Sequence, residues 1–244
     1  VIFLKLLRIH DLMDYTLIVP SVAVGNVGQL ACDLLISSLK MTKSATLHST
    51  AFIPVVGYDP YDLKSKSLSG SCDLYQCNAN KLLVLQLRAP LVYKYAKTFL
   101  TELVDLFKKK YIKDVIVLTS SFAHEKKHIL TSSFRYVANN VCLYSSEIAN
   151  LEWLPHESNE NGIKIPGGGF GVMLYELCVE NSLPCLILYK YCSEGDNIPD
   201  AYDMINYLSK ILPVFGKNAD PIAQLVQPVS WKLLFGRPPP QDMY

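Results

Sequence analysis

Short apolar runs rich in β-branched residues alternate along this chain with longer segments that have the periodicity of amphipathic helices. Strands that are joined by crossover helices usually pair in parallel, and the helices then cover both faces of the sheet. We therefore predict an α/β fold with a largely parallel central sheet sandwiched by helices. The predicted strands are 15–24, 51–56, 82–87, 114–119 and 186–191, and the predicted helices are 26–39, 91–111, 170–180 and 199–212.

The 244 residues contain no segment that must be a linker, so we expect one domain over residues 1–236. Half of the residues are hydrophobic, which is high for a soluble protein and favours some apolar surface covered by a permanent partner. The charges are balanced, with 23 basic and 22 acidic residues spread along the chain, and they provide no field to recruit nucleic acid or an anionic membrane.

The seven cysteines are odd in number and form no CxxC pair, which is typical of free thiols in a reducing compartment. The apolar start, residues 1–7, is interrupted by Lys5, lacks a signal-peptide cleavage site and is too short to span a membrane. We expect a cytoplasmic protein, with the nucleus as a further compartment.

Residues 124–128 spell HEKKH, which matches the HExxH pattern of zinc peptidases. The pattern requires a helix that places both histidines on one face, with the glutamate as general base. Here two lysines would lie beside the dication, the segment directly follows a predicted strand, and no third ligand follows at helical spacing. We therefore interpret His124, Glu125 and His128 as parts of a solvated loop and expect no catalytic metal there.

Two glycine-containing segments lie where predicted helices begin, but neither has the residue spacing of a phosphate-binding loop. Residues 25–28 lack the G-x-G-x-x-G spacing, and residues 167–171 lack both the last glycine of that pattern and the Lys-Ser/Thr of a P-loop. The glycines at 167–169 are better explained by positive φ angles and close backbone approach at a helix entry. No catalytic triad can be assembled, so we expect neither catalytic nor cofactor-binding residues.

The segment 193–201, SEGDNIPDA, predicts a turn after a strand, with Asn197 as helix cap and Asp200 reaching back in a capping box. It resembles a signature of the proteasome assembly chaperone 2 family. Similar blocks follow the family's order over most of the chain, whereas the region between Tyr136 and Asn161 matches poorly. The other blocks are 20–35 (PSVAVGNVGQLACDLL), 82–88 (LLVLQLR), 163–169 (IKIPGGG) and 230–236 (SWKLLFG).

The resemblance implies a phosphorylase-like α/β fold and a non-enzymatic chaperone that pairs with proteasome assembly chaperone 1 and promotes assembly of the 20S proteasome α ring. The alternative is an enzyme of a phosphorylase- or hydrolase-like fold that uses the glycines at 167–169 and the acidic turn 194–196. Trp231 and its apolar neighbours fit either a partner-facing patch or a docked terminal helix.

The last residues, 237–244, contain three prolines and are expected to project as a flexible tail. Family members carry a C-terminal hydrophobic-tyrosine-any motif that inserts between α subunits. Met243 and Tyr244 supply its first two positions and are our candidate α-ring contacts. No residue follows Tyr244 in the sequence, so either the natural chain continues or the motif is absent.

Overall fold

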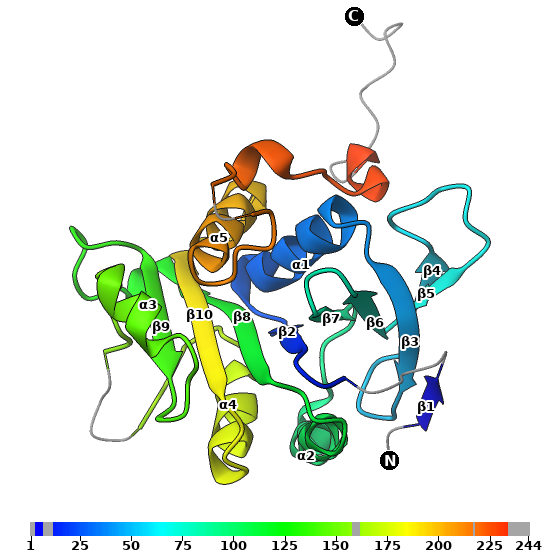
Figure 1. Cartoon of the computed structure of the whole chain (residues 1–244), viewed down its shortest axis with the longest axis horizontal. Helices are drawn as coiled ribbons and strands as arrows, with labels where there is room; N and C mark the ends of the chain where they lie inside the picture. The colour runs from blue at the N-terminus through cyan, green and yellow to red at the C-terminus, as the bar shows by residue number, and fades with distance from the viewer. Residues whose placement is uncertain (1–2, 7–11, 158–161, 217, 234–244) are drawn as a thin grey trace, which may run out of the picture.

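The computed structural model describes residues 3–6, 12–157, 162–216 and 218–233, and it has an eight-stranded sheet at its centre (Figure 1). The strand order is β1-β3-β6-β7-β2-β8-β10-β9, and a separate two-stranded hairpin, β4–β5, lies beside the sheet. The strands are β1 (Phe3–Leu6), β2 (Thr16–Pro20), β3 (Thr42–His48), β4 (Val56–Tyr58), β5 (Leu68–Gly70), β6 (Cys72–Cys77), β7 (Leu82–Leu87), β8 (Asp114–Phe122), β9 (Phe134–Ala138) and β10 (Cys185–Cys192). The helices are α1 (Val27–Ser38), α2 (Tyr93–Lys109), α3 (Ser145–Asn150), α4 (Gly171–Glu180) and α5 (Ile198–Ile211).

The sheet is mixed, so the prediction of a largely parallel sheet is correct only for its centre. Strands β7, β2, β8 and β10 are parallel neighbours, whereas β1, β3, β6 and β9 join antiparallel. Connection length explains the difference. A short turn at 78–81 joins β6 to β7 and forces them antiparallel, whereas α2 gives the chain the length to return in parallel from β7 to β8.

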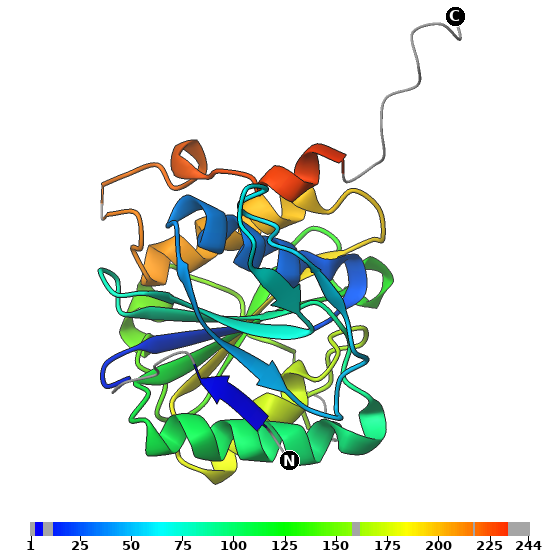
Figure 2. The ribbon, with the colours of Figure 1, turned by 90° about the vertical axis from the view of Figure 1, so that its right-hand side faces the viewer.

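Helices cover both faces of the sheet, as predicted (Figure 2). Each face has its own hydrophobic core. Side chains that alternate along β2 point to opposite faces, so Leu17 and Val19 join one core while Ile18 joins the other. Helices α2 and α4 cover the first face, and α1, α3 and α5 cover the second. Within the described residues, no helix combines the length and apolar composition that a membrane crossing needs.

Six strands were not predicted, β1, β3, β4, β5, β6 and β9, and one predicted strand is wrong. Of these, β3, β6 and β9 lack the continuous apolar runs of the buried parallel strands, because charged residues such as Lys43, Asp73 and Arg135 interrupt them. Residues 51–56 were predicted to be a strand, but Phe52 forms only an isolated bridge with Leu91, and β4 begins at Val56. Residues 58–70 contain β5 and most of a hairpin.

Helix α1 begins after Asn26, as expected, but Asn26 and Gln29 do not form a capping box although they have its residue types and spacing. Asn26 has a left-handed backbone, with φ +52°, and makes no side-chain cap. The Gln29 amide instead donates to the carbonyl of Leu87, 2.8 Å away. A 3₁₀ turn over Val24–Asn26 leads into the helix, so the entry is set by backbone geometry and not by side-chain capping.

The C-terminal part of the described chain packs back onto the second core. Trp231 lies in a 3₁₀ turn over Val229–Leu233 and is only 9% exposed. The sequence left open whether Trp231 belongs to a partner-facing patch or to a docked terminal segment, and its burial confirms the docked segment. All seven cysteines are free thiols, in agreement with the prediction, and five of them are buried.

Candidate partner-binding surface

In an open α/β sheet, ligands bind at the carboxyl ends of the parallel strands, and here those ends are occupied by the protein's own backbone. The hydroxyls of Ser21 and Thr119 both donate to the carbonyl of Gly168, at 2.7 and 2.9 Å. The Ser121 hydroxyl donates to the carbonyl of Pro166 at 2.8 Å. These hydroxyls hold the glycine loop in place and have no free proton to offer a substrate.

The glycine loop is structural, as predicted. Gly167 and Gly169 have φ angles of +78° and +61°. A Cβ on Gly169 would lie 2.2 Å from the carbonyl oxygen of Val22, and one on Gly167 would lie 2.8 Å from the ring of Phe122. The loop therefore needs glycine because it crosses directly over β2 and β8 before entering α4.

The acidic turn that the enzyme alternative would use is engaged in holding α5. The Asp196 carboxylate accepts from the backbone N–H of Ile198 at 3.1 Å. Asn197 occupies the cap position but makes no side-chain cap, and its amide donates instead to the Asp200 carboxylate at 2.7 Å. The capping box predicted for Asn197 and Asp200 is therefore wrong in its bonding, although the helix start is correct. Lys190 completes the cluster with an ion pair to Asp200 at 2.7 Å.

The HExxH residues do not share a helix face. β8 extends to Phe122, beyond the predicted strand end, and His124 and Glu125 then lie in a 3₁₀ turn. His128 lies in the following loop, where its Nε2 is 3.8 Å from the Glu157 carboxylate. His124 Nε2 is 3.6 Å from Glu125 itself. The loop interpretation is confirmed, and this arrangement lacks the helical geometry that the peptidase pattern requires.

The exposed face of the β4–β5 hairpin is the most apolar surface feature near the sheet edge. Tyr58 pairs across the strands with Leu68, and Val56 pairs with Gly70. Val56, Tyr58 and Leu68 are 71%, 84% and 58% exposed, and they lie on one side of the hairpin because side chains alternate. Ser69, which points the other way, is buried.

A groove of about 1140 Å³ lies between this hairpin and β3. Its apolar lining comes mainly from Leu47, Phe52, Val55, Val56 and Leu68, and its polar lining comes from serine and threonine side chains together with Lys43 and His48. An exposed apolar face beside an apolar groove is typical of a surface that a protein partner covers.

The buried carboxylate of Asp73 fixes the base of the hairpin. It accepts from the Ser69 hydroxyl at 3.0 Å and from the backbone N–H of Gly70 at 2.9 Å. Its other oxygen accepts from the Thr46 hydroxyl at 2.7 Å and pairs with Lys43 at 2.8 Å. One residue of β6 thus ties the hairpin to β3, the opposite wall of the groove.

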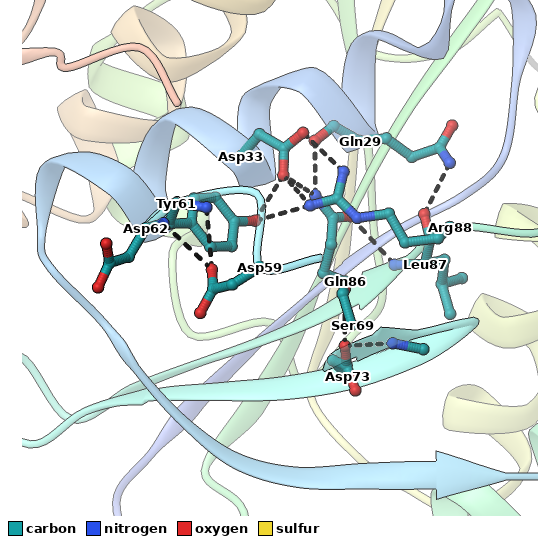
Figure 3. A network of polar contacts seen from close by, with 11 residues as sticks. Gln29, Asp33, Asp59, Tyr61, Asp62, Ser69, Asp73, Gln86, Leu87 and Arg88 are labelled. Carbon is teal, nitrogen blue, oxygen red and sulfur yellow. Dashed lines mark hydrogen bonds and ion pairs between the residues drawn. The ribbon is translucent and has the colours of Figure 1, made fainter. Parts of the chain in front are cut away.

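A second buried carboxylate, Asp33 of α1, fixes the loop between β4 and β5 (Figure 3). Arg88 donates to both of its oxygens, at 2.8 and 2.7 Å. The Tyr61 hydroxyl and the Gln86 amide also donate to it, at 2.5 and 2.6 Å. Burial, followed by the charge of Asp33, raises the pKa of Tyr61, so this phenol stays protonated as a donor. The hairpin is therefore held before any partner arrives, which lowers the entropic cost of binding.

This surface was not predicted from the sequence. Its only signal is the apolar run 51–58, AFIPVVGY, of which residues 51–56 were predicted to be a strand and not part of an exposed hairpin. The predicted α-ring contacts, Met243 and Tyr244, lie outside the described residues, as does the whole of 237–244.

Comparison with known proteins gives consistent results for sequence and fold. The model of the PAC2 family matches residues 17–221. Proteasome assembly chaperone 2 of Xenopus tropicalis is 37% identical, with 91% of this chain and 92% of the relative covered. The Homo sapiens chaperone of that name is 35% identical, with 96% of each chain covered.

Among solved structures, Pyrococcus furiosus PbaA, an archaeal homolog of proteasome-assembly chaperone, has the same fold with a TM-score of 0.70 and 17% identity. The alignment covers 91% of this chain and 90% of PbaA. Pyrococcus furiosus PbaB, an archaeal proteasome activator, follows with a TM-score of 0.68, 16% identity, and 91% and 92% coverage. The chain, with its helix-covered mixed sheet and a family match over most of its length, belongs to the PAC2 family.

Proposed function

We propose that this protein is a non-enzymatic chaperone of 20S proteasome assembly that acts as a heterodimer with a chaperone 1-like subunit and promotes formation of the α ring. The observation that carries the proposal is the relationship to proteasome assembly chaperones 2 over nearly the whole length of both chains. The engaged hydroxyls at the strand ends agree with a role that involves no catalysis.

The hairpin face is our candidate contact for the chaperone 1-like subunit. Val56, Tyr58 and Leu68 are exposed, apolar and held in a fixed arrangement by Asp33 and Asp73. A stable heterodimer buries at least about 1,200 Å² in total, and the hairpin with its adjoining groove provides an apolar centre for such an interface.

The tail 237–244 is our candidate contact for the α ring, with Met243 and Tyr244 as anchors. We propose that the domain over 1–236 is a single phosphorylase-like α/β unit from which this tail extends, and that the protein works in the cytoplasm and nucleus. Partial burial of Tyr244 would contribute about 1 to 3 kcal/mol to binding.

The pairing is tested by light scattering of the chain mixed with the chaperone 1-like subunit. The variant Val56→Ser/Tyr58→Ser/Leu68→Ser should weaken the heterodimer by about 2 to 4 kcal/mol, roughly 30- to 1,000-fold, because three apolar contacts are lost. Tyr93→Ser/Val179→Ser removes exposed apolar side chains from α2 and α4 and serves as the control. A wild-type chain that stays monomeric at micromolar concentration with the subunit present would refute the pairing.

The tail is tested separately, by the α-ring affinity of the intact heterodimer, of Tyr244→Ala and of a chain ending at Gly236. The intact heterodimer and Tyr244→Ala are made with the authentic C-terminus. Equal affinities for all three would show that the folded domain alone holds the ring.

A further inference from the structure

The loop between β8 and β9 presents two aliphatic side chains fully to solvent. Ile129 is 83% exposed and Leu130 is 101% exposed. Both follow the histidines and lysines of the HExxH segment, to which the proposed function assigns no role. Two adjacent aliphatic residues at a loop tip lose hydrophobic stabilisation unless another surface covers them.

The loop is held in shape by its own polar side chains. The Lys126 ammonium donates to the carbonyls of Ile129 and Thr131 and so closes the loop behind the aliphatic pair. The Thr131 hydroxyl donates to the carbonyl of His128 at 2.8 Å and accepts from Arg135 at 2.7 Å. The aliphatic tip is thus preformed, and a partner that binds it pays little ordering entropy.

The base of the loop is positively charged. Arg135 is 2% exposed, donates to the carbonyls of Ser132 and Phe134, and lies 4.0 Å from the Glu157 carboxylate. Water screens the charge of a buried guanidinium less than that of a solvated one, and neutral oxygens do not cancel it. Lys126 and Lys127 add two more cations beside the tip.

The loop lies far from the hairpin in the order of the sheet. It leads into β9, which is the edge strand at one end, whereas the hairpin lies beside β3 and β6 toward the other end. One partner that covers the hairpin therefore leaves the loop free for a second partner.

We propose that residues 126–131 are a preformed anchor that inserts Ile129 and Leu130 into an apolar pocket with a carboxylate rim on a folded protein partner. This rests on the proposed function, within which the partner is a proteasome α subunit. The loop then contacts the ring from the folded domain, in addition to the tail.

A protein pocket fits the loop better than a membrane surface does. Glu125 and Glu157 lie at the base of the loop, so among the described residues three permanent cations, Lys126, Lys127 and Arg135, face two carboxylates, and this excess is too small to hold an anionic bilayer. Two aliphatic side chains of fixed geometry suit a shaped pocket, since well-packed and fully desolvated contacts carry most of the binding energy of a protein interface.

The test is the affinity of purified α subunits for the immobilised heterodimer with intact tails, measured by biolayer interferometry. Ile129→Ser/Leu130→Ser should bind about 10- to 100-fold more weakly than wild type. Ile222→Ser/Val226→Ser, which removes two exposed aliphatic side chains from another segment, should bind as wild type does. Lys126→Gln should bind more weakly and show faster amide hydrogen exchange at residues 129–131, because its shorter side chain cannot close the loop.

The outcomes separate this inference from the function on which it rests. Wild-type binding with an unchanged affinity for Ile129→Ser/Leu130→Ser would overturn the anchor and leave the chaperone function intact. Failure of the wild-type heterodimer to bind α subunits would overturn both. Loss of binding by Ile129→Ser/Leu130→Ser to phosphatidylserine vesicles, but not to α subunits, would assign the loop to a membrane. Protection of amides 129–131 when α subunits are added to the wild type would support the anchor without any substitution.

Discussion

The ion pair between Asp33 and Arg88 provides a sharp test of how the hairpin is held. Arg88→Met removes two hydrogen bonds to a carboxylate that is 5% exposed, while Tyr61 and Gln86 still donate to it. Burial disfavours the charged form of Arg88, but the Asp33 carboxylate outweighs this and raises the pKa of the guanidinium. The Arg88 guanidinium therefore stays charged over the whole accessible pH range.

Breaking a buried pair by removing one partner costs about 3 to 5 kcal/mol, because the other charge is left uncompensated. The Arg88 side chain is 25% exposed and the remaining donors partly satisfy Asp33, so we expect a loss of about 2 to 4 kcal/mol. For a chain of this size that corresponds to a Tm lower by roughly 4 to 16 °C. Asp33→Asn/Arg88→Met should be less destabilised than Arg88→Met, because no buried charge remains.

The assay is thermal and urea unfolding of wild type, both single variants and the double variant, with hydrogen exchange of residues 59–66. Those amides should exchange faster in Arg88→Met, since Tyr61 connects the loop to Asp33. A Tm change below 1 °C for Arg88→Met, or a double variant less stable than Arg88→Met, would refute the reasoning.

Two further substitutions test the fold around the strand ends. Gly169→Ala should lose about 2 to 4 kcal/mol of unfolding free energy, because its Cβ would lie 2.2 Å from the carbonyl oxygen of Val22. As the control, the Cβ of Gly57→Ala meets nothing within 4 Å, so its unfolding free energy should stay within about 0.5 kcal/mol of wild type. Equal losses of unfolding free energy for the two variants in urea would contradict this prediction. Burial raises the pKa of Asp114, so the native state binds more protons than the unfolded state and wild-type stability falls as pH rises above the ordinary carboxyl range. Asp114→Asn, which can still accept from Thr16, should raise Tm at pH 7 and lose that advantage toward pH 4; a gain independent of pH would disprove the assignment.

The sequence predicts the centre of this fold well because the parallel strands are buried on both faces. The run 82–87 forms β7 as predicted, and 114–119 and 186–191 lie within β8 and β10. β3 is half-buried and polar at alternate positions, so its sequence, TKSATLH, carries no comparable signal.

The candidate surface could not be predicted from the sequence, since its order depends on contacts between distant residues. Asp33 and Arg88 are 55 positions apart, and neither pattern nor spacing connects them. Val56 and Tyr58 have the composition of a buried strand, but the structure leaves both exposed and buries Ser69 on the opposite side of the hairpin.

The capping predictions failed for a related reason. Asn197 and Asp200 have the residue types and spacing of a capping box, but Lys190 of the neighbouring strand pairs with Asp200. The Asn197 amide then donates to Asp200 and to the carbonyl of Ser193. A tertiary ion pair thus overrides a local pattern.

The central claim is that this chain, with its chaperone 1-like partner, promotes assembly of the α ring. The most direct measurement is native mass spectrometry of proteasome α subunits co-expressed with the heterodimer, with either subunit alone, and with neither. We expect α-ring complexes that carry one copy of each chaperone subunit. These complexes should be more abundant with the heterodimer than with either subunit alone or with neither. The same distribution of α species in all conditions, with no chaperone bound, would contradict it.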